Sequence, residues 1–383
     1  MLTGWERRLK AWEEAHLIDA ALAARIRDFE ALSARSGSWR WPVILAWVFG
    51  GMLLCAGVLL FVAAHWDNLP PSGRFALVGI MVAAFHVSGA LLRQRDDALG
   101  QVLHAVGTVA LGGGIYLAGQ IFNLQEHWPG AIMLWAAGAW LAWLLLRDRI
   151  QAVYCALLTP VWLAGEWSEA TRNMAGGQLL ASEGLCLLAL VYLGARMAGR
   201  EGPTRHDLAW IGGMSVIPLT FWVLFARNVW IDRGLTTIPT GLLLAGWALG
   251  YGGPLLLGFL LRARAGWMLI VAAIWVRLLG ATASGISASS ADFSWRKIST
   301  YVLCAVGSAL MAGWGILESR RERVNLAVAG FGLTVICFYF DSVMDKLGRS
   351  VSLMSLGLLF LLGGYALART RQRLMAKLAG GAP

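Results

Sequence analysis

Residues 129–146 read PGAIMLWAAGAWLAWLLL, an uncharged apolar stretch that ends at Arg147-Asp148-Arg149. A helix of about 20 apolar residues crosses the roughly 30 Å hydrocarbon core of a bilayer. The same character extends over the 383-residue chain, which is 58% hydrophobic and only 14% charged, whereas soluble domains carry about 25% charged residues. The sequence therefore predicts an integral membrane protein built from α-helices.

Twelve stretches have this length and character, and they predict an all-α fold with about twelve transmembrane helices. Their approximate limits are 42–64, 74–92, 98–120, 129–146, 150–167, 178–196, 207–227, 239–261, 266–284, 298–317, 324–343 and 350–368. The polar residues around them predict three regions. These are a helical hairpin at 1–40, a transmembrane domain at 41–368 and a basic tail at 369–383.

Lys and Arg are unevenly divided between the two sides of the predicted bundle. With the N-terminus inside, 23 of the 32 basic residues fall on the inner side and 8 on the outer side, while Arg277 lies within a span. Cytoplasmic loops are enriched in Lys and Arg, so we expect both termini in the cytoplasm. The net charge of +10 follows from these loops, and no nucleic-acid partner is expected.

The N-terminal region is expected to form two short helices within residues 3–33. Asp19 is placed to cap the second helix, whose apolar face would consist of Leu22, Ile26 and Phe29. A hairpin of this size cannot bury a sizeable core alone. It is therefore expected to dock on the membrane domain or to lie at the inner interface, with a regulatory or partner-binding role as the alternative.

Glycine and proline interrupt several predicted spans. Broken helices line midplane ligand sites in transporters, but close helix packing accounts for glycine equally well. Both interpretations stay open for the interruptions at 112–114, Pro160, Pro218 and the run Gly250-Tyr251-Gly252-Gly253-Pro254.

Polar residues collect at the predicted outer ends of the spans, and a few lie deeper. An ionisable group within the bilayer costs at least about 2.5–3.5 kcal/mol on insertion scales and is a functional candidate. If these span ends are neighbours, they form one outward-opening pocket that would suit a cation or a basic solute. The candidate residues are His65, Asp67, Gln120, Asn123, Glu126, His127, Glu166, Glu183, Arg277 and Asp341.

Arg277 and Glu183 are the deepest of these candidates. We expect Arg277 to face the bundle interior and to pair with an acid, either Glu183 or Asp341, and a purely structural ion pair is the alternative. The HWD and EH sequences at 65–67 and 126–127 could offer imidazoles and carboxylates to a metal, but their spacing is not a ligand pattern. No metal, cofactor or catalytic residue is predicted.

Several short motifs in the first 150 residues carry a family resemblance. They are LFVAAHWD at 60–67, the proline turn that leads to Arg74, GQIFNL at 119–124 and the following Trp135. Together with the helical head they resemble a bacterial multi-pass family, the domain of unknown function numbered twenty-one fifty-seven. The motifs RVNL at 323–326 and FYFD at 338–341 are similar to the C-terminal part of the same or a neighbouring family. The resemblance implies a bacterial inner-membrane location and assigns no activity.

Three classes of function are compatible with these features. The first is a transporter or permease whose outer pocket is lined by acidic residues and histidine. The second is a non-transporting scaffold or assembly factor for envelope biogenesis. The third is a membrane-embedded enzyme that acts on a lipid-linked or periplasmic substrate. Apart from the bilayer, the expected partners are a cation or basic solute.

Overall fold

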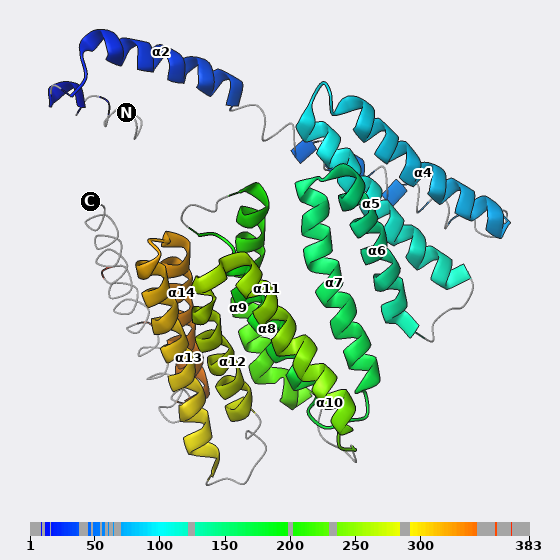
Figure 1. Cartoon of the computed structure of the whole chain (residues 1–383), viewed down its shortest axis with the longest axis vertical. Coiled ribbons are helices and arrows are strands. Elements are labelled where there is room, and N and C mark those ends of the chain that lie inside the picture. The colour runs from blue at the N-terminus through cyan, green and yellow to red at the C-terminus, as the bar shows by residue number, and fades with distance from the viewer. Residues whose placement is uncertain are drawn as a thin grey trace. The chain divides into compact units, whose positions relative to one another are not determined.

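The computed structural model describes residues 17–37, 70–121, 127–197, 202–229, 236–283 and 292–342, with isolated positions from 9 to 64 and at 357 and 369. Throughout these residues the regular elements are helices (Figure 1). The chain divides into two compact units, residues 1–151 and residues 152–383. The helices of the first unit are α2 (Ala20–Gly37), α4 (Pro71–Leu92), α5 (Asp97–Ile121) and α6 (Trp128–Leu146).

The second unit begins within α7 (Arg149–Ala170) and holds the remaining helices. They are α8 (Gly177–Leu193), α9 (Pro203–Val229), α10 (Thr240–Trp247), the π-helical η3 (Ala248–Gly252), α11 (Gly253–Arg262), the short η4 (Ala263–Gly266), α12 (Trp267–Ala283), α13 (Asp292–Leu317) and α14 (Arg321–Ser342).

Seven helices of the described part are long and apolar enough to cross a membrane. They are Ser72–Leu92, Asp97–Gly119, Trp128–Leu146, Pro203–Leu224, Thr240–Arg262, Ile298–Leu317 and Arg321–Phe340. Each coincides with a predicted span. Large apolar side chains such as Leu91, Leu145 and Leu260 are exposed on these helices, as expected for surfaces that meet hydrocarbon.

The predicted count of twelve spans is not confirmed. Two predicted spans are shorter apolar helices, Gly177–Leu193 and Trp267–Thr282. The span predicted at 150–167 falls on α7, a helix whose sequence includes Gln151, Glu166 and Glu169. The spans predicted at 42–64 and 350–368 fall largely outside the described residues, and so do both ends of the chain.

The core of the first unit lies between α4 and α5. Met81 and Phe85 of α4 pack against Val102, Val106 and Ala110 of α5. The turn that joins the two helices is closed by Asp96, whose carboxylate accepts from the backbone N–H groups at the start of α5. Such a cap satisfies N–H groups that have no partner within the helix.

The glycine triplet at 112–114 does not break α5. A Cβ at Gly112 would overlap the ring of Trp135 from α6, and one at Gly114 would overlap Val78 of α4. The Trp135 indole also donates to the Thr108 carbonyl oxygen at 2.8 Å. Close packing, rather than an opening in the helix, therefore explains these glycines.

The N-terminal helix α2 begins as the sequence predicts. The backbone N–H of Leu22 donates to the Asp19 carboxylate at 2.7 Å, so Asp19 caps the helix. Ala23 is buried. Leu22 and Phe29 of the predicted apolar face are exposed, with Phe29 at 67%.

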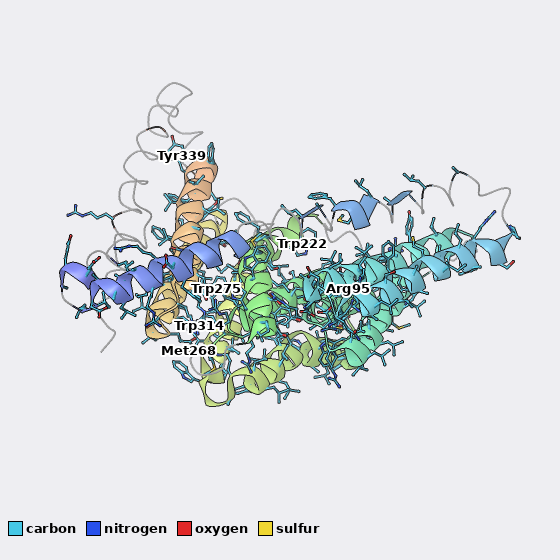
Figure 2. All side chains as sticks on the ribbon, turned by 90° about the horizontal axis from the view of Figure 1, so that it is seen from above. Arg95, Trp222, Met268, Trp275, Trp314 and Tyr339 are labelled. Carbon is cyan, nitrogen blue, oxygen red and sulfur yellow. The ribbon has the colours of Figure 1, made fainter. Side chains whose placement is uncertain are left out.

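In the second unit α8 is the central helix, with 12 of its 17 residues buried. Cys186, Leu190 and Leu193 of α8 form a core with Val216 of α9 and Val276 of α12. Trp314 of α13 forms a second cluster with Val191 of α8 and Leu269 of α12, and it is labelled in Figure 2.

A cluster of arginines joins the helix ends on one side of the second unit. Glu318, just after α13, accepts hydrogen bonds from Arg262 of α11 and Arg323 of α14. Both guanidinium groups are buried and also donate to backbone carbonyls at the end of α8, including Gly194 and Leu193. Positive charge at helix C-termini is favourable because the carbonyl groups there carry partial negative charge.

The charge of Glu318 is stabilised by this arginine cluster. Burial by itself would raise the pKa of the Glu318 carboxyl, but the hydrogen bonds and charges of Arg262 and Arg323 outweigh it and hold that pKa below its ordinary value. The Trp314 indole adds a further hydrogen bond at 2.7 Å. Glu318 therefore remains an anion that ties three helices together.

Candidate functional site

The deepest charged pair that the sequence predicts is present in the second unit. Arg277 Nη1 of α12 lies 2.7 Å from Glu183 Oε1 of α8. Glu183 is six residues from the start of α8, and Arg277 is six residues from the end of α12, so both are about 9 Å along their helices from those ends. The side chain of Glu183 is 1% exposed, whereas that of Arg277 is 46% exposed.

A π-helical turn supplies the third member of this site. The segment from Thr240 to Arg262 is helical throughout, but Ala248–Gly252 at its centre is π-helical. Tyr251, in that turn, donates its hydroxyl hydrogen to Glu183 Oε2 at 2.7 Å. Isolated π-helical turns inside α-helices are frequent at functional sites.

Trp247 completes the surroundings of the guanidinium. Its ring lies 5.4 Å from the Arg277 guanidinium carbon, measured to the ring centroid, and 4.9 Å from the Tyr251 ring. This is the distance range of a cation–π contact. Arg277 is therefore held by a carboxylate and by an aromatic face.

Glycines bring the helices of the site close together. A Cβ on Gly184 would lie 2.8 Å from the Gly250 Cα atom, so α8 and the π-helical turn are in backbone contact. A Cβ on Gly280 would overlap the Glu183 carboxylate. The carboxylate thus occupies a space that only glycine leaves free.

These contacts define what the site can do chemically. Both carboxylate oxygens of Glu183 have partners, one in Arg277 and one in Tyr251. The guanidinium is the more accessible partner because it is half-exposed. A cation that reaches Glu183 must therefore replace Arg277, and an anion would meet Arg277 first.

Among the residues that the structure describes, it brings together two of the ten predicted site residues, Glu183 and Arg277. Glu166 accepts a hydrogen bond from Trp162 at 2.9 Å, and His127 is exposed at the start of α6. Gln120 and Asp341 lie near the ends of α5 and α14, but their side chains are outside the described residues. His65, Asp67, Asn123 and Glu126 are outside the described residues altogether.

Sequence reasoning did not single out Tyr251 or Trp247 as site residues. The run Gly250-Tyr251-Gly252-Gly253-Pro254 was the available signal, because a tyrosine flanked by glycines interrupts an otherwise apolar span. The structure gives this interruption a role, since the π-helical turn directs the Tyr251 hydroxyl to Glu183.

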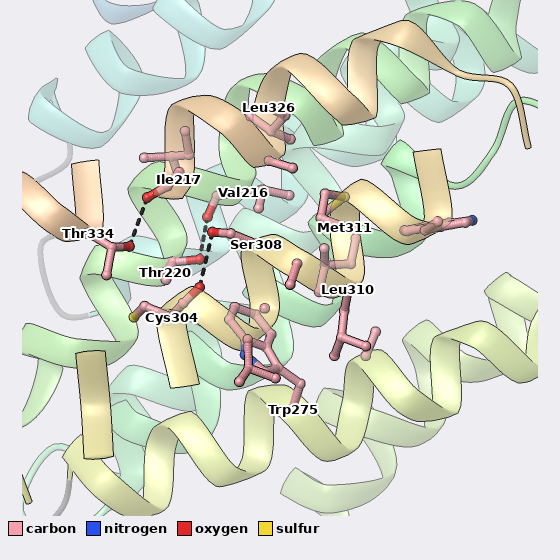
Figure 3. Close-up of a pocket in the computed structure, with 18 of the residues that line it drawn as sticks. Val216, Ile217, Thr220, Trp275, Cys304, Ser308, Leu310, Met311, Leu326 and Thr334 are labelled. Carbon is pink, nitrogen blue, oxygen red and sulfur yellow. Dashed lines mark hydrogen bonds between the residues drawn. The ribbon is translucent and has the colours of Figure 1, made fainter. Parts of the chain in front are cut away.

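An apolar cavity of about 570 Å³ lies elsewhere in the second unit, among α9, α12, α13 and α14 (Figure 3). Its Thr and Ser hydroxyl groups donate to backbone carbonyls of their own helices: Thr220 to Val216, Ser308 to Cys304 and Thr334 to Gly330. The Tyr301 hydroxyl of α13 donates to the Cys337 carbonyl of α14 at 3.4 Å. The described lining includes no carboxylate and no imidazole. The cavity accordingly suits an apolar group.

No metal centre is formed by the residues that the structure describes, since no three His, Cys, Asp or Glu side chains among them are grouped to hold an ion. The predicted His and Asp residues of the HWD sequence are outside that part of the chain.

The fold is that of a helical membrane protein. Residues 10–152 match a family described as "Predicted membrane protein (DUF2157)", which confirms the resemblance over the first part of the chain. The match ends at the start of α7, so Glu183 and Arg277 lie beyond it. No curated protein and no solved structure matches the chain.

Proposed function

We propose that this chain is a permease of the bacterial inner membrane, with both termini in the cytoplasm, and that Glu183 and Arg277 form its solute-binding centre. The observation that carries the proposal is a buried carboxylate whose only charged hydrogen-bond partner among the described residues is a half-exposed guanidinium, beside a π-helical turn. In this proposal α8 and α12 lie within the membrane, where ionisable groups commonly mark substrate or ion pathways.

The solute in this proposal is a cation or a basic solute that exchanges with Arg277 at Glu183. Removing one partner of a buried pair costs roughly 3–5 kcal/mol because the other charge is left uncompensated. Replacing one cation by another avoids that cost, so both the empty and the loaded states are accessible. Tyr251 keeps its hydrogen bond to the second oxygen and links the exchange to the π-helical turn.

The remaining acidic candidates contribute negative charge in this proposal, which would raise the local concentration of a cation at the membrane surface. They are Asp67, Glu126, Glu166 and Asp341. The candidates without negative charge, His65, Gln120, Asn123 and His127, would offer polar contacts to the solute.

Uptake of labelled methylguanidinium by proteoliposomes tests the proposal, because this ion copies the head group of Arg277. We expect uptake with the wild type and its loss with Glu183→Gln, which removes the charge while keeping the shape. Glu169→Gln is the matched control, since Glu169 pairs with the exposed Arg172. The absence of uptake by the wild type, or equal uptake by Glu183→Gln, would contradict the proposal.

A stability measurement tests the exchange step itself. Arg277→Ala leaves Glu183 without its cation, so methylguanidinium should raise the melting temperature of this variant more than that of the wild type. Arg172→Ala should show no such rescue. An equal effect of the ion on all three proteins would show that solutes do not take the place of Arg277.

One observation favours a second class of function. The exposed apolar face of α2, with Phe29 and Leu22, offers a surface for another protein. A scaffold or assembly factor for envelope biogenesis would use such a surface without moving a solute. In that case the wild type should show no methylguanidinium uptake, and deletion of residues 1–40 should abolish its cellular role.

A further inference from the structure

Two histidines of the first unit face each other across α4 and α5. The Nδ1 atoms of His86 and His104 are 3.1 Å apart. The ring centroids are 5.4 Å apart, which exceeds the nitrogen separation by about the width of one imidazole ring. The two Nδ1 atoms therefore point directly at each other, as in an N–H···N hydrogen bond. They are not both directed at a third atom between them, as two ligands of one metal ion would be.

Matching glycines hold this arrangement on the two helices. The sequence around the first ring is His86-Val-Ser-Gly89, and around the second it is His104-Ala-Val-Gly107. A Cβ on Gly107 would lie 2.9 Å from the His86 ring, and one on Gly89 would lie 3.0 Å from the His104 ring. Each imidazole thus lies against the backbone of the opposite helix.

Among the described residues, no carboxylate forms an ion pair or a hydrogen bond with either ring of the pair. His104 is 1% exposed, and its Nε2 is buried without a hydrogen-bond partner in that part of the chain. The positive charge of Arg93, at the end of α4, acts on His104. Arg93 and Asp97, in the first turn of α5, in turn act on the buried Asp148 before α7. Arg93 and Asp97 form an ion pair with each other at 3.0 Å.

The hydrogen bond sets a limit on how many protons the pair can hold. One Nδ1 must carry a hydrogen and the other must be bare. If both rings become imidazolium ions, neither Nδ1 can accept, and two positive charges face each other in a poorly solvated space. Arg93 adds a further positive charge nearby. The contact between α4 and α5 at this point must then open.

We propose that His86 and His104 form a proton-binding site that joins α4 to α5 through one N–H···N bond and separates them when acidification charges both rings. The site lies within the residues that match the family, and it is independent of the proposed solute centre in the second unit. Its ligand is a proton, and its effect is to loosen the helix pair at the core of the first unit.

Thermal unfolding of the full chain at pH 8 and pH 5 tests this inference. The melting temperature of the wild type should fall on acidification by more degrees than that of His86→Gln, because glutamine cannot take up a proton. His206→Gln is the control, since His206 is exposed on α9, and it should behave as the wild type does. Equal acid shifts in the wild type and His86→Gln would overturn the proposal.

A spectroscopic measurement on the wild type does not depend on the folding of a variant. The chain has six histidines, so labelling with ¹⁵N-histidine gives a simple spectrum. At pH 8 two Nδ1 resonances should be coupled through the shared proton, and this coupling should disappear as the pH is lowered to 3, where both rings take up a proton. A coupling that persists at pH 3, or that is absent at pH 8, would refute the site.

Discussion

Glu183 and Arg277 contribute unequally to the stability of their pair. Glu183 is buried at 1% exposure and has Tyr251 as its only other hydrogen-bond partner among the described residues. Arg277 is half-exposed and can be solvated or turned toward the Trp247 ring. Loss of the arginine is therefore the costly change, because the remaining charge is the buried one.

We predict that Arg277→Ala lowers the free energy of unfolding by up to roughly 3–5 kcal/mol, the range for breaking a buried pair. Arg172→Ala should cost less than about 1 kcal/mol, since Arg172 is 75% exposed and lies 3.7 Å from Glu169. The yield of folded protein and the melting temperature in detergent measure both variants. Equal values would show that water or lipid head groups solvate Glu183 once Arg277 is gone.

Among the helices, Glu318 joins the ends at the arginine cluster. Glu318 binds Arg262 from α11 and Arg323 from α14, and these arginines reach the end of α8. Because its pKa is lowered in the folded state, Glu318 stabilises the fold fully above the ordinary value of 4.5. That contribution is lost as the pH falls through the lowered folded value.

Glu318→Gln should therefore reduce stability by up to roughly 3–5 kcal/mol at pH 7, and the difference from the wild type should shrink as the pH approaches 3. Chemical unfolding of both proteins between pH 7 and pH 3 measures this. A difference that stays constant over that range would mean that the carboxylate charge does not hold the helix ends.

At the scale of the molecule, hydrogen bonds and ion pairs within each unit bring together the loops that are predicted to lie on the inner side of the membrane. In the first unit, Arg93 binds Asp97 and the Leu146 carbonyl, which brings the connections at 93–97 and 147–149 to one end. In the second unit, the arginine cluster joins the connections at 196–205, 262–264 and 318–323. Within each unit, the loops that these contacts join are the Arg-rich loops that the sequence predicts on the inner side.

Cysteine labelling tests which side these connections occupy. In a chain freed of its native cysteines, Arg95→Cys and Arg321→Cys should react only with reagents on the cytoplasmic side, because Lys and Arg are retained there. Gln125→Cys should react only from outside. Labelling of position 125 from the cytoplasm alone would reverse the predicted orientation.

Composition and apolar run length determine the class of this protein by themselves, because residues such as 129–146 can be stable only in hydrocarbon or a large core. They also fix where the helices lie, since each predicted span in the described residues falls on a helix. The depth of Arg277 in an apolar stretch was enough to predict an acidic partner, and to limit the choice to Glu183 or Asp341.

Only the tertiary structure showed that Glu183 is the partner of Arg277 and that Tyr251 binds the same carboxylate. Partners on different helices depend on how the helices pack and rotate against each other, and sequence spacing does not encode this. The same holds for His86 and His104. Each is an isolated histidine in its own span, and only the close approach of α4 and α5 at Gly89 and Gly107 brings the rings together. Glycines permit such a close approach of two helices, and the side chain that fills the space beside each glycine comes from the opposite helix.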